Sequence, residues 1–323
     1  MTYWLRYIEI VDIDMTHKIA ITLSSFNQDD PNVIELFERN NLTIKINRLG
    51  RTLKSDEILE LLQDCSGVVA GTEHYNDEIL KKLLDLKVIS RCGVGIENID
   101  LEMCRVRGIQ VFNVHEGPAK AVAELVIGLA LNLLRNITMM NQELKSGIWK
   151  KRMGQLFADK IVGILGFGHI GKEVAKLSEA LGAHVLYYDS ASLMESIASP
   201  VTFSDLLLRS DIISVNLPLT LETRRIISYK EFLLMKKNSI LINCSRGGIV
   251  DENALYDALK NQRISGAAVD VFESEPYEGP LRNLNNIILS PHIGSYAKEA
   301  RLKMELAAIH NLIKGLNEKT NCN

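Results

Sequence analysis

The sequence of 323 residues lacks the marks of several large classes of protein. It has no Cys-x-x-Cys pair and no cysteine at metal-ligand spacing from a histidine, so we expect no disulfide framework and no structural metal. Its formal net charge of −3 provides no excess of positive charge for a nucleic acid or a membrane surface. No basic and then apolar leader opens the chain, and the most apolar window, residues 121–134, is too short to span a bilayer. We therefore expect a cytoplasmic protein, with five cysteines that are thiols: Cys65, Cys92, Cys104, Cys244 and Cys322.

What the sequence does contain is an alternation of short apolar runs and helical patterns, which occurs twice. Hydrophobic residues make up 46% of the chain, as in globular proteins, and the length suffices for two domains. The alternation predicts parallel sheets that are covered by helices on both faces. In the first part we expect strands at 18–23, 42–46, 67–70, 87–90 and 109–112, and helices near 31–40, 55–63, 76–84 and 100–107. In the second part we expect strands at 161–165, 184–188, 212–215, 239–243, 266–270 and 286–289, and helices near 169–181, 203–209, 228–236 and 251–260.

Two longer helical patterns divide the chain. One runs over residues 119–145, between the two alternations, and the other, residues 296–316, comes after the second. We therefore expect a central domain, residues 117–292, and a smaller discontinuous domain that combines residues 1–116 and 293–323. Residues 1–15 resemble an extension ahead of the first strand.

The most specific motif follows the first strand of the second part. There an apolar run leads into Gly166-Phe-Gly168-His169-Ile170-Gly171, and a helical pattern follows. Gly166 permits a tight turn, Gly168 lets the backbone approach a pyrophosphate, and Gly171 lets the helix pack closely on the strand. The N-terminus of that helix attracts the phosphate charge.

An acidic residue ends the next strand of this unit. The carboxylate of Asp189 can accept hydrogen bonds from the ribose hydroxyl groups of NAD. It would repel the 2′-phosphate of NADP, and no arginine or lysine follows in residues 190–192. The strand, the glycine turn, the helix and the acid together predict a domain that binds NAD.

Three neighbouring strands of the second part end in side chains that suit hydride transfer to a carbonyl. Such a reaction needs a proton donor and a group that orients the substrate. Arg246 follows one strand and precedes two glycines, Asp270 and Glu275 follow the next strand, and His292 follows the last. Glu273 is the alternative carboxylate, since it lies two residues before Glu275.

The ordered motifs make the chain resemble the NAD-dependent D-2-hydroxyacid dehydrogenases, in the branch that contains D-3-phosphoglycerate dehydrogenase. The resemblance covers nearly the whole chain from about residue 18. It implies two doubly wound parallel-sheet α/β domains, a central Rossmann domain for NAD and a smaller, discontinuous, flavodoxin-like domain for the substrate. It also implies D stereochemistry and a homodimer. The motifs that carry it are residues 91–100, 166–171, 243–248, 269–276 and 290–292.

The resemblance implies a role for each matching residue. His292 would protonate the substrate carbonyl as the hydride arrives, and Glu275 would pair with it. Arg246 would grip the substrate carboxylate and polarise the keto oxygen. The resemblance also assigns to the substrate the residues Arg91, Gly93, Val94 and Gly95. The loop 93–95 would bind through its backbone N–H groups. In addition to the glycine turn and Asp189, the residues implied for NAD are Pro218, Cys244, Ser245, Asp270 and Gly294.

Departures from the family pattern bear on the substrate. The loop 113–120 differs from the usual sequence. Relatives that act on 3-phosphoglycerate tend to carry an arginine after the third strand, where this chain has Gly71, and Glu73 close by is a poor neighbour for a phosphate. The sequence also ends after one helix, without the regulatory domain of many phosphoglycerate dehydrogenases. We therefore expect a 2-keto acid that is not phosphorylated.

Three alternatives stay open. One is a genuine D-3-phosphoglycerate dehydrogenase of serine biosynthesis. Another, suggested by the loop 113–120, is a dehydrogenase for a sugar acid or another larger 2-hydroxy acid. The third is a non-catalytic module that senses NAD(H), which the presence of Arg246, Glu275 and His292 does not exclude. No nucleic acid, membrane or metal partner is expected.

Overall fold

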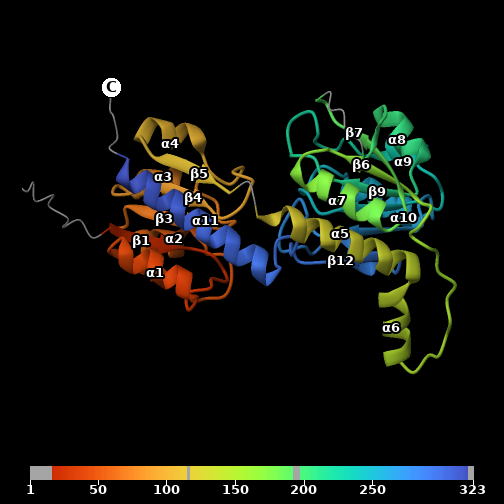
Figure 1. Ribbon diagram of the computed structural model, residues 1–323, viewed down its shortest axis with the longest axis horizontal. Coiled ribbons are helices and arrows are strands. Elements are labelled where there is room, and N and C mark those ends of the chain that lie inside the picture. The colour runs from red at the N-terminus through yellow and green to blue at the C-terminus, as the bar shows by residue number, and fades with distance from the viewer. Residues whose placement is uncertain (1–16, 115–116, 192–196, 319–323) are drawn as a thin grey trace, which may run out of the picture. The chain divides into compact units, whose positions relative to one another are not determined.

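The computed structural model describes residues 17–114, 117–191 and 197–318, which form two compact units (Figure 1). The first unit contains residues 17–114 and 302–318, and the second contains residues 117–191 and 197–301. The predicted N-terminal extension and part of the loop 113–120 lie outside the described residues.

The first unit is built on a parallel sheet of five strands in the order β2-β1-β3-β4-β5. Apolar residues on alternate faces of the strands allow helices to cover both sides. On one face, Ala20 and Val68 pack with residues of α2, α3 and α4, and on the other, Ile19 and Val69 pack with α1 and α11. The strands are β1 (His17–Ile21), β2 (Leu42–Ile46), β3 (Gly67–Ala70), β4 (Val88–Arg91) and β5 (Gln110–Asn113). The helices are α1 (Pro31–Arg39), α2 (Ser55–Leu62), α3 (Asp77–Lys82), α4 (Leu101–Arg107) and α11 (Lys298–Asn317).

The second unit contains a parallel sheet of seven strands in the order β12-β11-β10-β9-β6-β7-β8. Helices α5 and α7 pack on one face of it, around Ile164 and Val162, and α8, α9 and α10 pack on the other, around Ile213 and Leu241. The strands are β6 (Ile161–Leu165), β7 (His184–Tyr188), β8 (Ser199–Pro200), β9 (Ile212–Val215), β10 (Ile240–Asn243), β11 (Gly266–Val269) and β12 (Ile287–Leu289). The helices are α5 (Pro118–Arg135), α6 (Ile137–Lys145), α7 (His169–Ala180), α8 (Phe203–Arg209), α9 (Tyr229–Leu234) and α10 (Glu252–Lys260), with a 3-10 turn, η1 (Pro280–Asn283).

Both strand orders confirm the predicted fold class. In the first sheet the chain starts at β1, adds β2 on one side and then β3, β4 and β5 on the other, which is the flavodoxin order. In the second it starts at β6, adds β7 and β8 on one side and then β9 to β12 on the other, which is the Rossmann order. Ligands of such sheets bind beyond the carboxyl ends of the strands where the order reverses.

The prediction of one continuous helix over residues 119–145 is wrong. The structure has two helices, α5 and α6, whose axes are bent by 61°. They meet at Asn136, which has a left-handed φ of 54°, a conformation that asparagine tolerates better than most residues. The side chain of Asn132 then caps α6, because its Oδ1 accepts a hydrogen bond of 2.9 Å from the backbone N–H of Thr138.

Within the described part of the chain, no single helix is long and apolar enough to cross a membrane. The bent pair of α5 and α6 reaches the required length and hydropathy only when the two helices are taken together.

Candidate active site

The glycine turn joins β6 to α7 and has the shape that a pyrophosphate needs. An added Cβ at Gly166 would lie 2.6 Å from the carbonyl oxygen of Asn216, and one at Gly171 would lie 2.2 Å from that of Gly166. These two glycines therefore allow close backbone packing. Gly168 has open space where its Cβ would be, and it precedes α7, whose first turn has no side-chain cap. The open space and the N-terminal N–H groups fit the phosphates of a dinucleotide.

Asp189 closes the same turn from the end of β7. One carboxylate oxygen accepts a hydrogen bond of 2.6 Å from the backbone N–H of Phe167, and the other accepts one of 2.9 Å from the backbone N–H of Ala191. Each oxygen keeps a second lone pair, so the half-buried carboxylate can also accept hydrogen bonds from ribose hydroxyl groups. The residues present at the turn thus fit NAD.

His292 and Glu275 form a hydrogen-bonded pair at the neighbouring strand ends. Nδ1 of His292 lies 2.8 Å from Oε2 of Glu275, and Oε1 of Glu275 accepts a hydrogen bond of 3.0 Å from the backbone N–H of Phe272. Burial raises the pKa of Glu275, but its hydrogen bonds and the charges of His292 and Arg246 outweigh burial and lower that pKa. Because Nδ1 is engaged, Nε2 is the ring nitrogen that can exchange a proton with a ligand.

Asp270 holds the turn that carries His292. Its carboxylate is fully buried and accepts hydrogen bonds of 2.6 Å from Ser290 Oγ, 2.8 Å from Ile293 N and 2.8 Å from Gly294 N. Burial raises the pKa of Asp270, while these hydrogen bonds oppose the rise. His292 has a left-handed φ of 55°, which these contacts stabilise. The resemblance implied Asp270 only as a residue for NAD. The structure adds this positioning role, which the sequence of residues 290–294 does not indicate.

Arg246 lies in a loop that is held by Asn243, a motif residue to which the sequence analysis assigned no role. Oδ1 of Asn243 accepts hydrogen bonds of 3.1 Å from Ser245 N and 2.8 Å from Ser245 Oγ. Its Nδ2 donates a hydrogen bond of 3.1 Å to the carbonyl oxygen of Arg246. Asn243 ends β10 and is 2% exposed, so a buried asparagine at a strand end was the available signal. The loop backbone around Arg246 is thereby constrained.

Gly247 brings the Arg246 loop against the Glu275 loop. A Cβ at Gly247 would lie 2.0 Å from the carbonyl oxygen of Phe272, so only glycine allows this approach. Glu273, the rival of Glu275, is engaged elsewhere. Its two carboxylate oxygens each lie 3.3 Å from a nitrogen of the Arg225 guanidinium group. The structure therefore selects Glu275 as the partner of His292.

The remaining residues implied for NAD also follow strands of the second sheet. Pro218 comes after β9, Cys244 and Ser245 come after β10, and Gly294 comes after β12. Burial, and to a smaller extent the negative charge of Asp270, raises the pKa of the Cys244 thiol well above its ordinary value. Cys244 therefore acts as an apolar side chain and not as a nucleophile. His169 and Ile170 form the first turn of α7, where Ile170 packs against the core.

The residues implied for the substrate carboxylate lie in the first unit, after β4. Arg91 ends the strand, and its Nη1 donates a hydrogen bond to the carbonyl oxygen of Cys92. A Cβ at Gly93 would collide with the same guanidinium group, so Gly93 allows Arg91 to lie flat against the loop. Asn113 Nδ2 donates a hydrogen bond of 2.7 Å to the carbonyl oxygen of Val94. The loop Gly93-Val94-Gly95 is thus tied to two neighbouring strands.

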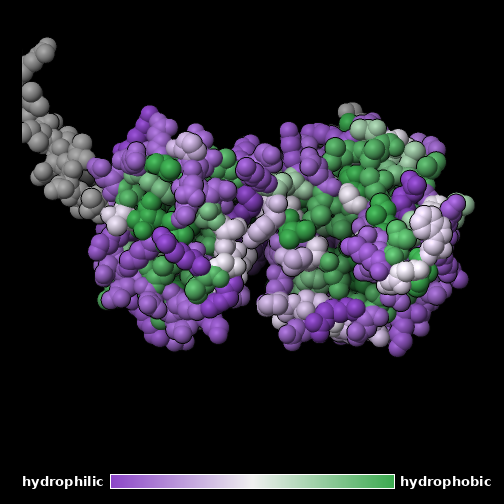
Figure 2. Space-filling model, turned by 90° about the horizontal axis from the view of Figure 1, so that it is seen from below, coloured by the Kyte–Doolittle hydropathy of each residue, from purple (hydrophilic) through white to green (hydrophobic). Residues whose placement is uncertain are grey.

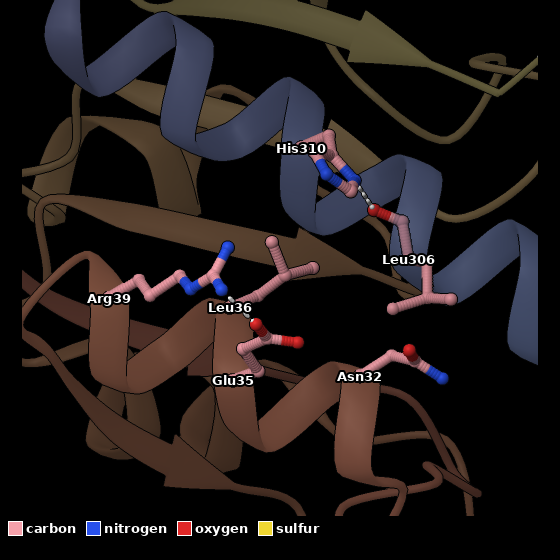
Figure 3. A pocket seen from close by; sticks show the side chains of 6 residues that line it. All are labelled: Asn32, Glu35, Leu36, Arg39, Leu306 and His310. Carbon is pink, nitrogen blue, oxygen red and sulfur yellow. Dashed lines mark hydrogen bonds and ion pairs between the residues drawn. The ribbon is translucent and has the colours of Figure 1, made fainter.

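A groove with a volume of about 220 Å³ lies between α1 and α11 of the first unit (Figure 3). Its charged groups already have partners, because Arg39 pairs with Glu35, and His310 Nδ1 lies 2.8 Å from the carbonyl oxygen of Leu306. It contains none of the residues implied for NAD or the substrate. Within residues 17–114, 117–191 and 197–318, no group of three or more His, Cys, Asp or Glu side chains could hold a metal ion.

Comparisons with known proteins identify the family. The family described as D-isomer specific 2-hydroxyacid dehydrogenase, NAD binding domain, matches residues 127–294. The D-3-phosphoglycerate dehydrogenase of Methanocaldococcus jannaschii is 40% identical over 259 residues, which are 77% of this chain and 49% of that protein, so the chain spans about half its length. The glyoxylate reductase of Thermococcus litoralis is 40% identical over 271 residues, covering 79% of this chain and 82% of that protein. The crystal structure of the TT0316 protein from Thermus thermophilus superposes with a TM-score of 0.87 at 30% identity, covering 95% of this chain and 99% of that one.

Proposed function

The chain belongs to the D-isomer specific 2-hydroxyacid dehydrogenase family, and we propose on that basis that it interconverts a 2-keto acid and a D-2-hydroxy acid. The observation that carries the proposal is the hydrogen bond of 2.8 Å between His292 and Glu275, at the edge of the sheet that also holds Arg246 and the glycine turn. A dinucleotide site next to an oriented imidazole and a guanidinium group is what hydride transfer to a carbonyl requires.

The glycine turn and Asp189 would hold NADH, which would supply the hydride that adds to C2 of the keto acid in the direction of reduction. His292 Nε2 donates a proton to the carbonyl oxygen, and Glu275 holds the ring and stabilises its charged form through Nδ1. Arg246 binds the substrate carboxylate and polarises the keto oxygen, because its planar donors suit both groups. In oxidation, Nε2 takes the proton back from the hydroxyl group.

For the substrate we propose an unphosphorylated 2-keto acid. Two relatives with the same identity to this chain are named for different substrates. One is a D-3-phosphoglycerate dehydrogenase and the other is a glyoxylate reductase. This chain has Gly71 where the phosphate-binding arginine is expected. The idea that Glu73 would face a phosphate directly is not supported, since its side chain is turned inward and hydrogen-bonded to Thr22 and Gly71.

A panel of 2-keto acids tests the proposal. Consumption of NADH would be followed with pyruvate, glyoxylate, hydroxypyruvate, 3-phosphohydroxypyruvate and keto-sugar acids. We expect turnover with an unphosphorylated acid, and a kcat/KM at least about tenfold higher with NADH than with NADPH, because Asp189 repels a 2′-phosphate. A strong preference for 3-phosphohydroxypyruvate would favour a D-3-phosphoglycerate dehydrogenase. Binding of NADH without turnover of any acid would favour the sensing module.

We propose further that the protein is a homodimer that associates through the segment after α5. This segment exposes large apolar side chains, including Trp149 at 80% and Met153 at 96% exposure. Figure 2 shows the molecule from below, which is the side toward which α6 extends in Figure 1. Hydrophobic patches are visible on this face. We expect light scattering to give twice the chain mass and W149D/M153D to give the monomer mass. A wild-type monomer would contradict the proposal.

A cytoplasmic location is proposed from the thiols. Cys65, Cys104 and Cys244 are buried cysteines outside any disulfide, and burial raises the pKa of each of them. Unoxidised cysteines are typical of a reducing compartment.

A further inference from the structure

One residue joins the two loops that carry Arg246 and Glu275. Arg225 lies between β9 and α9, and its backbone N–H donates a hydrogen bond of 2.7 Å to the carbonyl oxygen of Gly248, just after Arg246 in the chain. Its guanidinium group reaches the other loop, where Nε and Nη2 each lie 3.3 Å from a carboxylate oxygen of Glu273, just before Glu275. Arg225 therefore bridges the loops that follow β10 and β11.

The backbone of Arg225 is fixed by its surroundings. It has a left-handed φ of 51°, which residues other than glycine seldom adopt. The segment that follows is hydrogen-bonded to residues 249–251, because Ile227 N donates to the carbonyl oxygen of Ile249 at 3.4 Å and Asp251 N donates to that of Ile227 at 2.9 Å. The guanidinium group thus extends from a backbone position that is tied to the loop after β10.

Glu273 is held at its backbone as well as at its side chain. Its N–H donates a hydrogen bond of 2.8 Å to Oε1 of Glu252, the first residue of α10. The peptide between Phe272 and Glu273 is also the one that packs against Gly247, where an added Cβ would lie 2.0 Å from Phe272 O and 2.6 Å from Glu273 N. The contact between the two loops is therefore centred on this peptide, and Arg225 binds the side chain beside it.

The same peptide segment orients the pair that exchanges the proton. The backbone N–H of Phe272 donates a hydrogen bond of 3.0 Å to Oε1 of Glu275, while Oε2 of Glu275 lies 2.8 Å from Nδ1 of His292. A rotation of residues 272–273 would move the N–H group that orients this carboxylate. The hydrogen bond to the imidazole would then lose its alignment, and hydrogen bonds weaken steeply when they are misaligned.

We propose that Arg225 is a positioning residue, which through its ion pair with Glu273 keeps the carboxylate of Glu275 directed at His292. This inference rests on the proposed function and adds a residue that acts on its catalytic pair. The side chains of Arg225 and Glu273 are 50% and 32% exposed, so the effect is moderate and decreases with added salt. Glu273, the rival of Glu275 in the sequence, thereby supports the carboxylate that it resembles.

The variants R225Q and E273Q test the proposal, because each breaks the ion pair. The measurement is kcat/KM for reduction of the best 2-keto acid against pH, which falls on the basic side as the general acid loses its proton. We expect both variants to lower kcat/KM about twofold to fivefold and to move the midpoint of this fall to lower pH by about half a unit. The reason is that a loosened Glu275 stabilises the protonated imidazole less.

The direction of the shift in R225Q separates positioning from a direct effect of charge. Removing a positive charge near His292 would by itself favour the protonated imidazole and move the midpoint to higher pH. The charged groups at the imidazole and its turn, Glu275 and Asp270, and Arg246 on the adjacent loop are the same in the variant and the wild type. A shift to lower pH therefore identifies a change in the orientation of Glu275.

The double variant R225Q/E273Q should match the single variants, since either change breaks the same pair. R209Q is the matched control, because Arg209 is an exposed arginine in the last turn of α8, and its pH profile should equal that of the wild type. If R225Q does not fold, as judged by circular dichroism, R225M replaces it with the same expected results. A midpoint that is unchanged or higher in the folded variant, or additive losses in the double variant, would overturn the role of Arg225. The proposed function fails separately, if the wild type reduces no 2-keto acid at all.

Discussion

Replacing His292 with alanine is expected to lower kcat for 2-keto acid reduction by about 10²–10⁴-fold, with a much smaller effect on the Kd for NADH. The imidazole is the group that can donate the proton, and it is held by Glu275 at 2.8 Å and by the turn that Asp270 supports. Its side chain is 39% exposed, so its removal leaves no unpaired buried donor and little cost in stability. The loss should therefore be catalytic.

The measurement is steady-state reduction of the best 2-keto acid, with NADH binding followed by fluorescence. H310A is the matched control, because His310 is an exposed histidine of α11 whose Nδ1 contacts its own helix at Leu306. We expect E275Q to lower kcat by about 10-fold to 10²-fold, since glutamine keeps a hydrogen bond to the ring but no longer stabilises its charge. If H292A retained the wild-type kcat, the assignment of His292 as the acid would be wrong.

Replacing Gly247 with alanine is expected to lower kcat/KM by about 10²-fold, the cost of moving catalytic groups by about 1 Å. The new Cβ would lie 2.0 Å from the carbonyl oxygen and 2.1 Å from the carbonyl carbon of Phe272. Backbone atoms cannot rotate away as a side chain can, so one loop must move. The loop that contains Gly247 carries Arg246, and the loop that contains Phe272 carries Glu275. The overpacking should also lower the free energy of unfolding by about 1–3 kcal/mol.

Urea denaturation and steady-state kinetics would measure the two effects. G248A is the matched control, because Gly248 has a left-handed φ of 78° but a Cβ there would meet its nearest atoms at 3.7 Å. Its expected cost is about 1 kcal/mol of backbone strain, without displacement of either loop. If G247A behaved like G248A in both measurements, close approach of the two loops would not be what requires glycine at position 247.

Much of this architecture follows from local patterns in the sequence. Alternating strands and helices indicated two doubly wound sheets, because a parallel strand needs a crossover helix to reach its neighbour. The glycine turn and Asp189 could be identified as parts of an NAD site because their spacing reflects one strand, one turn and one helix. Arg246, Glu275 and His292 could be selected as candidate residues because each follows a strand, and parallel strands end at the same edge of a sheet.

Other properties were decided by contacts that hydrophobic periodicity does not reveal. Helical periodicity continues through Asn136, and only the left-handed turn there, capped from Asn132, shows that α5 ends. The spacing of Glu273 and Glu275 did not distinguish them, and only the family resemblance favoured Glu275. The structure pairs Glu273 with Arg225 and Glu275 with His292. The partner of Glu275 lies 17 residues away along the chain and the partner of Glu273 lies 48 residues away. Hydrophobic periodicity indicates which face of an element is buried, but it does not specify which polar side chains pair.

The burial of Glu73 also depends on tertiary contacts. As a sequence it is an acid in a loop, and acids in loops are usually exposed to solvent. The fold turns its side chain inward, where Thr22 Oγ1 and the backbone N–H of Gly71, which follow two neighbouring strands, donate hydrogen bonds to its Oε2. The sequence by itself determined which strands and turns this protein has, since those depend on neighbouring residues. Only the tertiary structure decided which side chain meets which, since burial and pairing are properties of the packed sheet edge.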